Sequence, residues 1–176
     1  VALLKRMAAQ GAACVGVRNA VDDAIEAVEA LGDSGVDARL LHARFALSDR
    51  KRIEAEILAR VGNNGKGREG FVLVGTQVLE SSLDLDFDVM LSDLAPVAAL
   101  IQRAGRLWRH MDVRPASGRP VAGPVLHVLS PDPMQIEDDR WLHGTLGKGA
   151  WVYAITDVWR SASVLFAQGR IGVPRE

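Results

Sequence analysis

Short apolar runs alternate with amphipathic helical segments along most of this chain, and this alternation limits the folds that it can adopt. Runs typical of strands lie at residues 12–17, 38–41, 71–74, 87–91 and 125–129. Helices are predicted over residues 1–9, after Asn19, over residues 48–60 and from Pro96 onward. The run 71–74 is apolar at every position, as expected of a strand covered on both faces. The pattern predicts a doubly wound, mostly parallel α/β sheet flanked by helices.

The helix starts and the buried helix faces follow from residue type and spacing. Asn19 and Ser48 belong to the residue types that cap helix amino termini, so each is expected to begin a helix. The residues expected to face inward from the helix over 48–60 are Ile53, Ile57 and Leu58. After Pro96, apolar residues recur at i, i+3, i+4 and i+7, and these are expected to form a buried face: Val97, Leu100, Ile101 and Ala104.

Composition excludes several classes of protein. The 176 residues are 48% hydrophobic and 24% charged, enough for one globular domain with a core. A pI near 6.5 excludes a uniformly basic nucleic-acid binder. One cysteine, Cys14, permits neither a disulfide framework nor a zinc site. No run approaches about 18 apolar residues, and the order of a signal peptide is lacking, so a cytoplasmic protein with no membrane partner is expected. The absence of an initiating methionine suggests a fragment or a processed chain.

The pattern changes after Pro131. Two prolines, at 131 and 133, and an acidic run are followed by three tryptophans. We therefore predict one domain over residues 1–131, followed at residues 132–176 by a linker and the start of a C-terminal accessory region.

Residues 102–110 contain three arginines and no acid, in a chain whose formal net charge is −1. Gln102, Arg106 and Arg109 lie at i, i+4 and i+7 and share a second helix face unless Gly105 ends the helix first. Guanidinium groups are planar, always charged and able to donate two hydrogen bonds at once to phosphate oxygens. A solvated basic helix end is an equally simple interpretation, because arginine there complements the helix dipole. The segment alone leaves both interpretations open.

Polar residues also follow the predicted strands, where ligands of open α/β sheets bind. Thr76 follows the run 71–74, and its hydroxyl can donate to a phosphate oxygen. Asp84 and Asp86 lie at alternate positions and can accept from sugar hydroxyls or from the arginines. Arg44 and Arg18 follow two further strands. Each residue alone is more simply a turn or capping residue, but together they favour a functional edge of the sheet.

Four ordered segments resemble the later motifs of a superfamily 2 helicase, on the second of its two RecA-like domains: residues 17–19, 41–45, 76–84 and 102–110. Two motifs are similar to those of the CRISPR-associated helicase–nuclease of type I interference systems. They are Glu-Ser-Ser-Leu-Asp-Leu-Asp-Phe-Asp at 80–88 and Arg-Leu-Trp-Arg-His at 106–110. The resemblance covers roughly residues 10–130, and a weaker similarity extends to residues 151–153 and 159–160.

The resemblance implies a site for ATP and a track for single-stranded DNA. Arg106 and Arg109 match positions that reach the triphosphate, one of them as an arginine finger. Gln102 matches a residue that senses the γ-phosphate and positions the attacking water, and Asp84 matches a position near the ribose or the arginines. The residues implied to contact the DNA are Thr76, Gln77, Arg18, Arg44 and Arg103. The implied partners are single-stranded DNA, the first RecA-like domain of the same protein and a CRISPR effector (Cascade-like) complex.

Motifs of the first RecA-like domain are missing from this sequence. Residues 62–68 contain three glycines and a lysine but in the wrong order for a Walker A loop, and no Asp-Glu-x-His motif occurs. No metal site is therefore predicted in the chain, and the ligands of Mg²⁺ are expected on the missing domain. The chain alone is expected to be inactive as an ATPase and as a nuclease. Another superfamily 2 DNA or RNA helicase, or a non-catalytic interaction module, remains an alternative.

Overall fold

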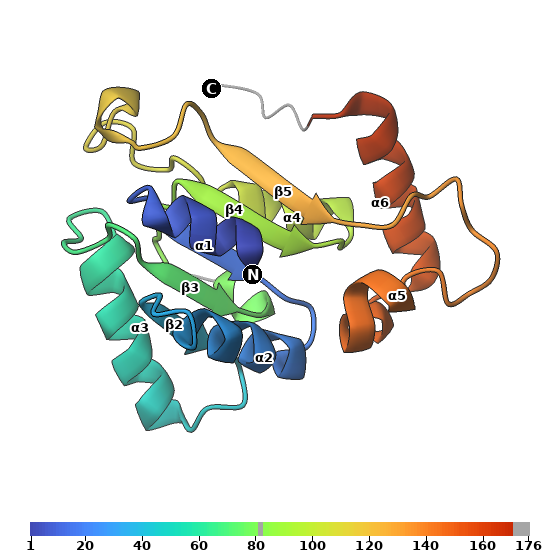
Figure 1. Cartoon of the computed structure of the whole chain (residues 1–176), viewed down its shortest axis with the longest axis horizontal. Helices are drawn as coiled ribbons and strands as arrows, with labels where there is room; N and C mark the ends of the chain where they lie inside the picture. The colour runs from blue at the N-terminus through green and yellow to red at the C-terminus, as the bar shows by residue number, and fades with distance from the viewer. Residues whose placement is uncertain (81–82, 171–176) are drawn as a thin grey trace.

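The fold is a five-stranded parallel sheet with helices on both faces (Figure 1), seen in a computed structural model that describes residues 1–80 and 83–170. The strand order is β2-β3-β1-β4-β5. The strands are β1 (Cys14–Val17), β2 (Ala38–Leu41), β3 (Val72–Gly75), β4 (Val89–Asp93) and β5 (Val125–Leu129). The predicted doubly wound sheet is confirmed, with β4 beginning two residues later than the apolar run.

The helices divide between the two faces of the sheet. They are α1 (Ala2–Ala9), α2 (Val21–Gly32), α3 (Leu47–Val61), α4 (Val97–Ala104), α5 (His143–Leu146) and α6 (Ile155–Gln168). Short 3-10 helices are η1 (Gln77–Glu80), η2 (Ala116–Gly118) and η3 (Gly147–Trp151). Two apolar clusters share the strands: Val15 and Leu73 pack on the face that holds α3 and η1, whereas Cys14 and Val72 pack on the face that holds α1 and α2. This alternation is the period of two that strands impose.

Two predicted helix caps are wrong. Helix α2 begins at Val21 with Ala20 as its N-cap, and the Asn19 side chain donates to the carbonyl of Leu94 instead. Helix α3 begins at Leu47, so Ser48 lies inside the first turn and makes no capping hydrogen bond. The contact of Asn19 with Leu94 joins residues 75 positions apart, so the local pattern could not reveal it.

The predicted buried face of α4 is only partly right. Leu100 is fully buried, but Val97 and Ile101 are 42% and 44% exposed. The helix instead turns Arg103, which is 1% exposed, toward the sheet. Leu58 of α3 is likewise more exposed than expected, at 38%. The spacing of apolar residues alone therefore does not predict which face of α4 is buried.

The residues after Pro131 pack on the rest of the chain. A third apolar cluster joins Leu94, next to β4, to Leu142, Leu146 and Val158 of the C-terminal segment. The Ser161 hydroxyl of α6 accepts a hydrogen bond from the backbone N–H of Val97 at 2.9 Å. Figure 1 shows α5 and α6 beyond the sheet, on the side of β5. Within residues 1–80 and 83–170, no helix is both long and apolar enough to cross a membrane.

Candidate functional site

The carboxyl ends of β1, β3 and β4 bring several of the predicted residues together. The buried carboxylate of Asp93 accepts hydrogen bonds from the Asn19 backbone N–H at 2.8 Å and from Arg18 Nε at 3.0 Å. Burial raises the pKa of the Asp93 carboxyl, and the Arg18 guanidinium partly offsets this. Gln77 Nε2 donates to the Asn19 carbonyl at 3.0 Å. The loops after these strands are thus fixed to one another by side chains.

Thr76 and Arg44 differ in accessibility at this same edge. Thr76 is 3% exposed, and its backbone N–H donates to the carbonyl of Leu41 at 3.3 Å. The Arg44 side chain is 67% exposed and pairs with Asp22 at 3.0 Å. Arg44 therefore has a cationic side chain that a ligand can reach. The Thr76 side chain is buried, so this residue contributes mainly to the conformation of the turn after β3.

The imidazole of His42 supports the turn after β2. It stacks on Phe45 with ring centroids 4.2 Å apart, and its Nδ1 accepts from the Arg44 backbone N–H at 3.2 Å. Burial lowers the pKa of His42, and the nearby Arg44 charge lowers it further. The histidine is therefore kept neutral as part of the turn.

Arg103 is buried, so in this structure it has no surface to offer a nucleic acid. Its guanidinium pairs with Glu80 at 2.7 Å and donates to Ser92 Oγ at 2.7 Å and to the Asp93 carbonyl at 3.1 Å. It also reaches the Tyr153 hydroxyl at 3.3 Å. The side chain predicted to contact DNA instead joins η1, β4 and the C-terminal segment.

Arg106 and Arg109 lie beside the residues that lead into β4. Helix α4 ends at Ala104, with Gly105 as its C-cap, so the helix does not continue through the arginine row. The backbone of Phe87 donates to the carbonyl of Arg106 at 2.9 Å and accepts from the N–H of Trp108 at 3.0 Å. These bonds hold the segment 106–108 alongside Phe87 as an isolated parallel bridge.

Arg109 forms a partly exposed ion pair, and its charge acts on the nearby Arg106. Arg109 Nε donates to Asp84 Oδ1 at 2.6 Å, and both side chains are about half exposed, 43% and 52%. His110 Nε2 lies 3.3 Å from the other Asp84 oxygen, though without hydrogen-bond geometry. Burial and the like charge of Arg109 together lower the pKa of Arg106. Two guanidiniums of like charge close to one another, with that of Arg109 about half exposed, suit the binding of a phosphate.

The predicted residues therefore form two groups at opposite ends of β4. Arg18, Thr76 and Gln77 lie at its carboxyl end with Asp93, whereas Arg106 and Arg109 lie at its amino end. Glu80 contacts Arg106 of the second group directly and reaches the first group through Arg103, which donates to the Asp93 carbonyl. Its carboxylate binds Arg103, and its carbonyl accepts from Arg106 Nη2 at 3.2 Å. Gln102 is exposed on the last turn of α4. Ser81 and Ser82, which belong to the motif at residues 80–88, lie outside the described residues.

A buried ionic cluster before β4 was missed by the sequence analysis, which noted only Asp84 and Asp86. Asp86 and Asp88 are fully buried and bind Arg119 at 3.0 and 3.1 Å. Arg114 forms a two-pronged contact with Asp88 at 2.6 and 2.8 Å. Carboxylates at alternate positions directly before an apolar strand were the available signal, because such positions point inward and need cationic partners.

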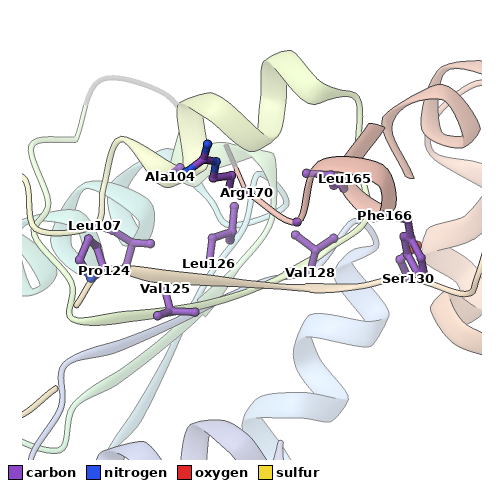
Figure 2. Close-up of a pocket in the computed structure, with 11 residues that line it drawn as sticks. Ala104, Leu107, Pro124, Val125, Leu126, Val128, Ser130, Leu165, Phe166 and Arg170 are labelled. Carbon is purple, nitrogen blue, oxygen red and sulfur yellow. The ribbon is translucent and has the colours of Figure 1, made fainter. Parts of the chain in front are cut away.

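An apolar groove lies away from both groups. Figure 2 shows it between β5, the end of α4 and the end of α6, with Leu126, Val128 and Leu165 on its walls. Its volume is about 560 Å³, and Arg170 is the charged residue of its lining. With one charged residue among the described residues of a mostly apolar lining, the groove lacks the cationic groups that a triphosphate needs.

Comparison with known proteins gives one consistent family. The model of the family described as CRISPR-associated nuclease/helicase Cas3, C-terminal, matches residues 10–112. The CRISPR-associated endonuclease/helicase Cas3 of Escherichia coli (strain K12) is 40% identical over 136 residues, which are 74% of this chain and 15% of the relative. The Cas3 of Streptococcus thermophilus is 50% identical over 84 residues, 48% of this chain and 9% of the relative. The chain spans less than a fifth of the length of these relatives.

Solved structures agree with this result. The crystal structure of T. fusca Cas3 superposes with a TM-score of 0.83 at 33% identity over 96% of this chain and 19% of that one. The same protein crystallised with AMPPNP gives a TM-score of 0.81 at 34% identity over 94% of this chain and 19% of that one. A chain in a CRISPR RNA-guided surveillance complex, pre-nicking, gives 0.72 at 33% identity over 89% and 19%. The five-stranded sheet is therefore the RecA-like domain of these enzymes, as predicted.

Proposed function

We propose that this chain, which belongs to the Cas3-like C-terminal family of CRISPR-associated nuclease/helicases, acts as the second RecA-like domain of an ATP-dependent single-stranded DNA translocase. In that role it completes a nucleotide site between two RecA-like domains. The observation that carries the proposal is the pair Arg106 and Arg109: the charge of Arg109 lies close enough to Arg106 to lower its pKa, and the Arg109 side chain is 43% exposed. The crystallisation of a relative with AMPPNP supports ATP as the nucleotide.

The two arginines and Gln102 divide the chemistry of phosphoryl transfer. Arg109 is the arginine finger: its exposed guanidinium balances charge that develops on the transferred phosphoryl group. Arg106 binds the triphosphate from the more buried side, and Gln102 contacts the γ-phosphate and orients the attacking water. Asp84 holds the finger through Arg109 Nε until a phosphate competes for the guanidinium. The Walker A loop and the Mg²⁺ ligands come from the first RecA-like domain.

The DNA track runs over the carboxyl ends of the strands. Arg44 and Arg18 supply positive charge, and Thr76 and Gln77 supply the shaped turn after β3 that meets the sugar-phosphate backbone. Arg103 supports this edge from beneath, because its side chain is buried against Asp93. Because Glu80 binds both Arg103 and Arg106, a structural change at the nucleotide is transmitted to the DNA track. Cycles of cleft closure and opening then move the two domains along one DNA strand.

The partners follow from the family. The match to a chain within an RNA-guided surveillance complex supports a Cascade-like effector as the partner that delivers DNA, in the cytoplasm and in antiviral defence. Residues 132–176 begin an accessory region beyond the RecA-like domain of residues 1–131, and that region docks on the domain through the cluster around Leu94.

The decisive experiment is the replacement Arg109→Ala in the complete protein that carries both RecA-like domains. ATP turnover at saturating single-stranded DNA should fall by a factor on the order of 10³. The control Arg52→Ala removes an exposed arginine of α3 that contacts only Asp49 at 3.7 Å among the ion pairs of the described residues, and should leave turnover unchanged. Unchanged turnover in Arg109→Ala refutes the arginine finger. Stimulation by RNA in place of DNA refutes the substrate, since the 2′-hydroxyl distinguishes the two.

The isolated chain provides a second test. It should hydrolyse no ATP, because half of the nucleotide site is on another domain. DNA-stimulated hydrolysis by the purified chain contradicts this division of the site.

A further inference from the structure

The backbone immediately before Arg109 adopts an unfavourable conformation. Among the described residues, Trp108 is the one non-glycine residue with a positive φ, 50°. Such a conformation is unfavourable for a non-glycine residue and persists only where the surroundings impose it. A bulky aromatic residue is a poor choice for that position unless its ring is needed there.

Two hydrogen bonds impose this conformation. The Trp108 N–H donates to the carbonyl of Phe87 at 3.0 Å, and the Arg109 N–H donates to Asp86 Oδ1 at 2.8 Å. Asp86 is fully buried, so its carboxylate is a fixed point rather than a mobile surface group. The peptide groups on both sides of Trp108 are therefore anchored to the segment before β4.

Arg119 connects the ring to the same carboxylate. Its Nη2 donates to both oxygens of Asp86, at 3.0 and 3.1 Å. The carbon of its guanidinium lies 5.0 Å from the centroid of the Trp108 ring, within the range of a cation–π contact. The Arg119 side chain is fully buried. Arg119 thus contacts both the indole and the carboxylate that binds the Arg109 backbone. Arg68 Nη1 also donates to this carboxylate, at 3.1 Å, but among the described residues only the Arg119 guanidinium lies over the indole.

We infer that Asp86, Trp108 and Arg119 form a positioning device that holds Arg109 in register with the nucleotide; this inference rests on the proposed function of Arg109. Stability alone is a poor explanation for the device, because a buried ion pair contributes little net stability and a positive φ opposes it. The Trp108 indole N–H is also buried without an acceptor in the part of the chain that the structure describes. The positive φ of Trp108, its indole N–H and the buried pair of Asp86 and Arg119 all adjoin the backbone of Arg109. The side chain of Arg109 is bound by Asp84.

The test uses Arg119→Lys in the complete protein with both RecA-like domains. Lysine keeps the charge next to Asp86 but loses the planar fork and the flat contact with the indole. The rate constant for ATP turnover, kcat, should fall by up to about 10²-fold, as displacements near 1 Å cause, while KM for ATP changes less than about threefold. Combined with Arg109→Ala, Arg119→Lys should cause no further loss, because the residue on which it acts is gone.

Arg114→Lys is the matched control. Arg114 belongs to the same buried cluster and forms a two-pronged contact with Asp88, but it lies farther from Asp86, at 3.6 Å. Its replacement should lower the melting temperature about as much as Arg119→Lys and leave kcat within about twofold, since the contacts to Arg109 and Trp108 remain. Equal losses of kcat in the two lysine variants overturn the inference, as does an Arg119→Lys loss that persists in the Arg109→Ala background.

Trp108→Gly decides the matter if Arg119→Lys does not fold. Glycine adopts φ 50° without strain and leaves the Asp86–Arg119 pair intact, so the fold should survive while the backbone gains freedom. Turnover should fall in the wild-type background and be unchanged in the Arg109→Ala background; full turnover in Trp108→Gly overturns the inference. If Arg109→Ala itself retains full turnover, it is the proposed function that fails, and the two failures are therefore distinguishable.

Discussion

Replacing Arg103 with alanine should destabilise the chain far more than replacing an exposed arginine. The change removes a fully buried cation that contacts Glu80 and Ser92 at 2.7 Å each and the Asp93 carbonyl at 3.1 Å. Breaking a buried ion pair by deleting one partner costs about 3–5 kcal/mol. The Glu80 side chain is 16% exposed, so water can reach it after the change, and the lower end of that range is expected.

The free energy of unfolding can be measured by urea titration of this chain, followed by tryptophan fluorescence. At about 2–4 °C per kcal/mol for a domain of this size, a loss of about 3 kcal/mol should lower the melting temperature by about 6–12 °C. Arg52→Ala, on the surface of α3, is the control and should change the unfolding free energy by about 0.5 kcal/mol or less. The double change Arg103→Met with Glu80→Met removes both charges and should cost less than Arg103→Ala. An Arg103→Ala loss as small as that of Arg52→Ala refutes the buried position of this side chain.

Three further predictions concern groups away from the arginine pair. Burial, aided by the charge of Asp88, raises the pKa of the Cys14 thiol to about 12; a thiol reagent at pH 8 should therefore modify it only as fast as the chain unfolds, and rapid modification of the folded chain contradicts this. The pKa of His42 is lowered below its usual 6.5, so the unfolded chain binds the proton more readily and the unfolding free energy should decrease as pH falls through about 6.5; an imidazole NMR titration with a midpoint above that value would reverse the sign. A Cβ at Gly75 would lie 2.5 Å from the Leu41 carbonyl oxygen, so Gly75→Ala should cost about 1–3 kcal/mol. A Cβ at Gly32 would meet no atom within 4 Å apart from its own helix backbone, so Gly32→Ala should be neutral or slightly stabilising. Equal unfolding free energies for Gly75→Ala and Gly32→Ala would refute the close approach of Gly75 to Leu41.

The fold followed from local patterns because strand and helix periods are local properties. The sheet was predictable from five apolar runs, and Gly105 correctly marked the possible end of α4. The position of Arg103 was not predictable. Its burial depends on Glu80, 23 residues earlier, and on Asp93, which approach it only once β4 and η1 are in place. Spacing within a single helix carries no information about such partners.

The sequence predicted which residues belong to the candidate site better than it predicted how they are arranged in space. Asp84 was expected to be able to accept from the arginines, and it binds Arg109. The cluster of Asp86, Asp88 and Arg119 could not be derived, because Arg119 lies in an irregular segment more than 30 residues after the two carboxylates that it binds. Irregular segments have no period from which a direction can be inferred.

The contact between α2 and η3 has a consequence for the order of events during synthesis. Asp22 and Asp23 bind Lys148 and the backbone N–H of Gly149, partners that lie 126 positions later in the chain. At about 5–20 residues per second, a ribosome needs about 6–25 s to make the intervening chain. During that interval the corner after β1 lacks its final partners. Once Leu94 has been made, the apolar surface around it also stays uncovered until the C-terminal helices are complete. A chaperone that recognises nascent apolar surface should therefore associate with this chain until residues near 150 have left the ribosome.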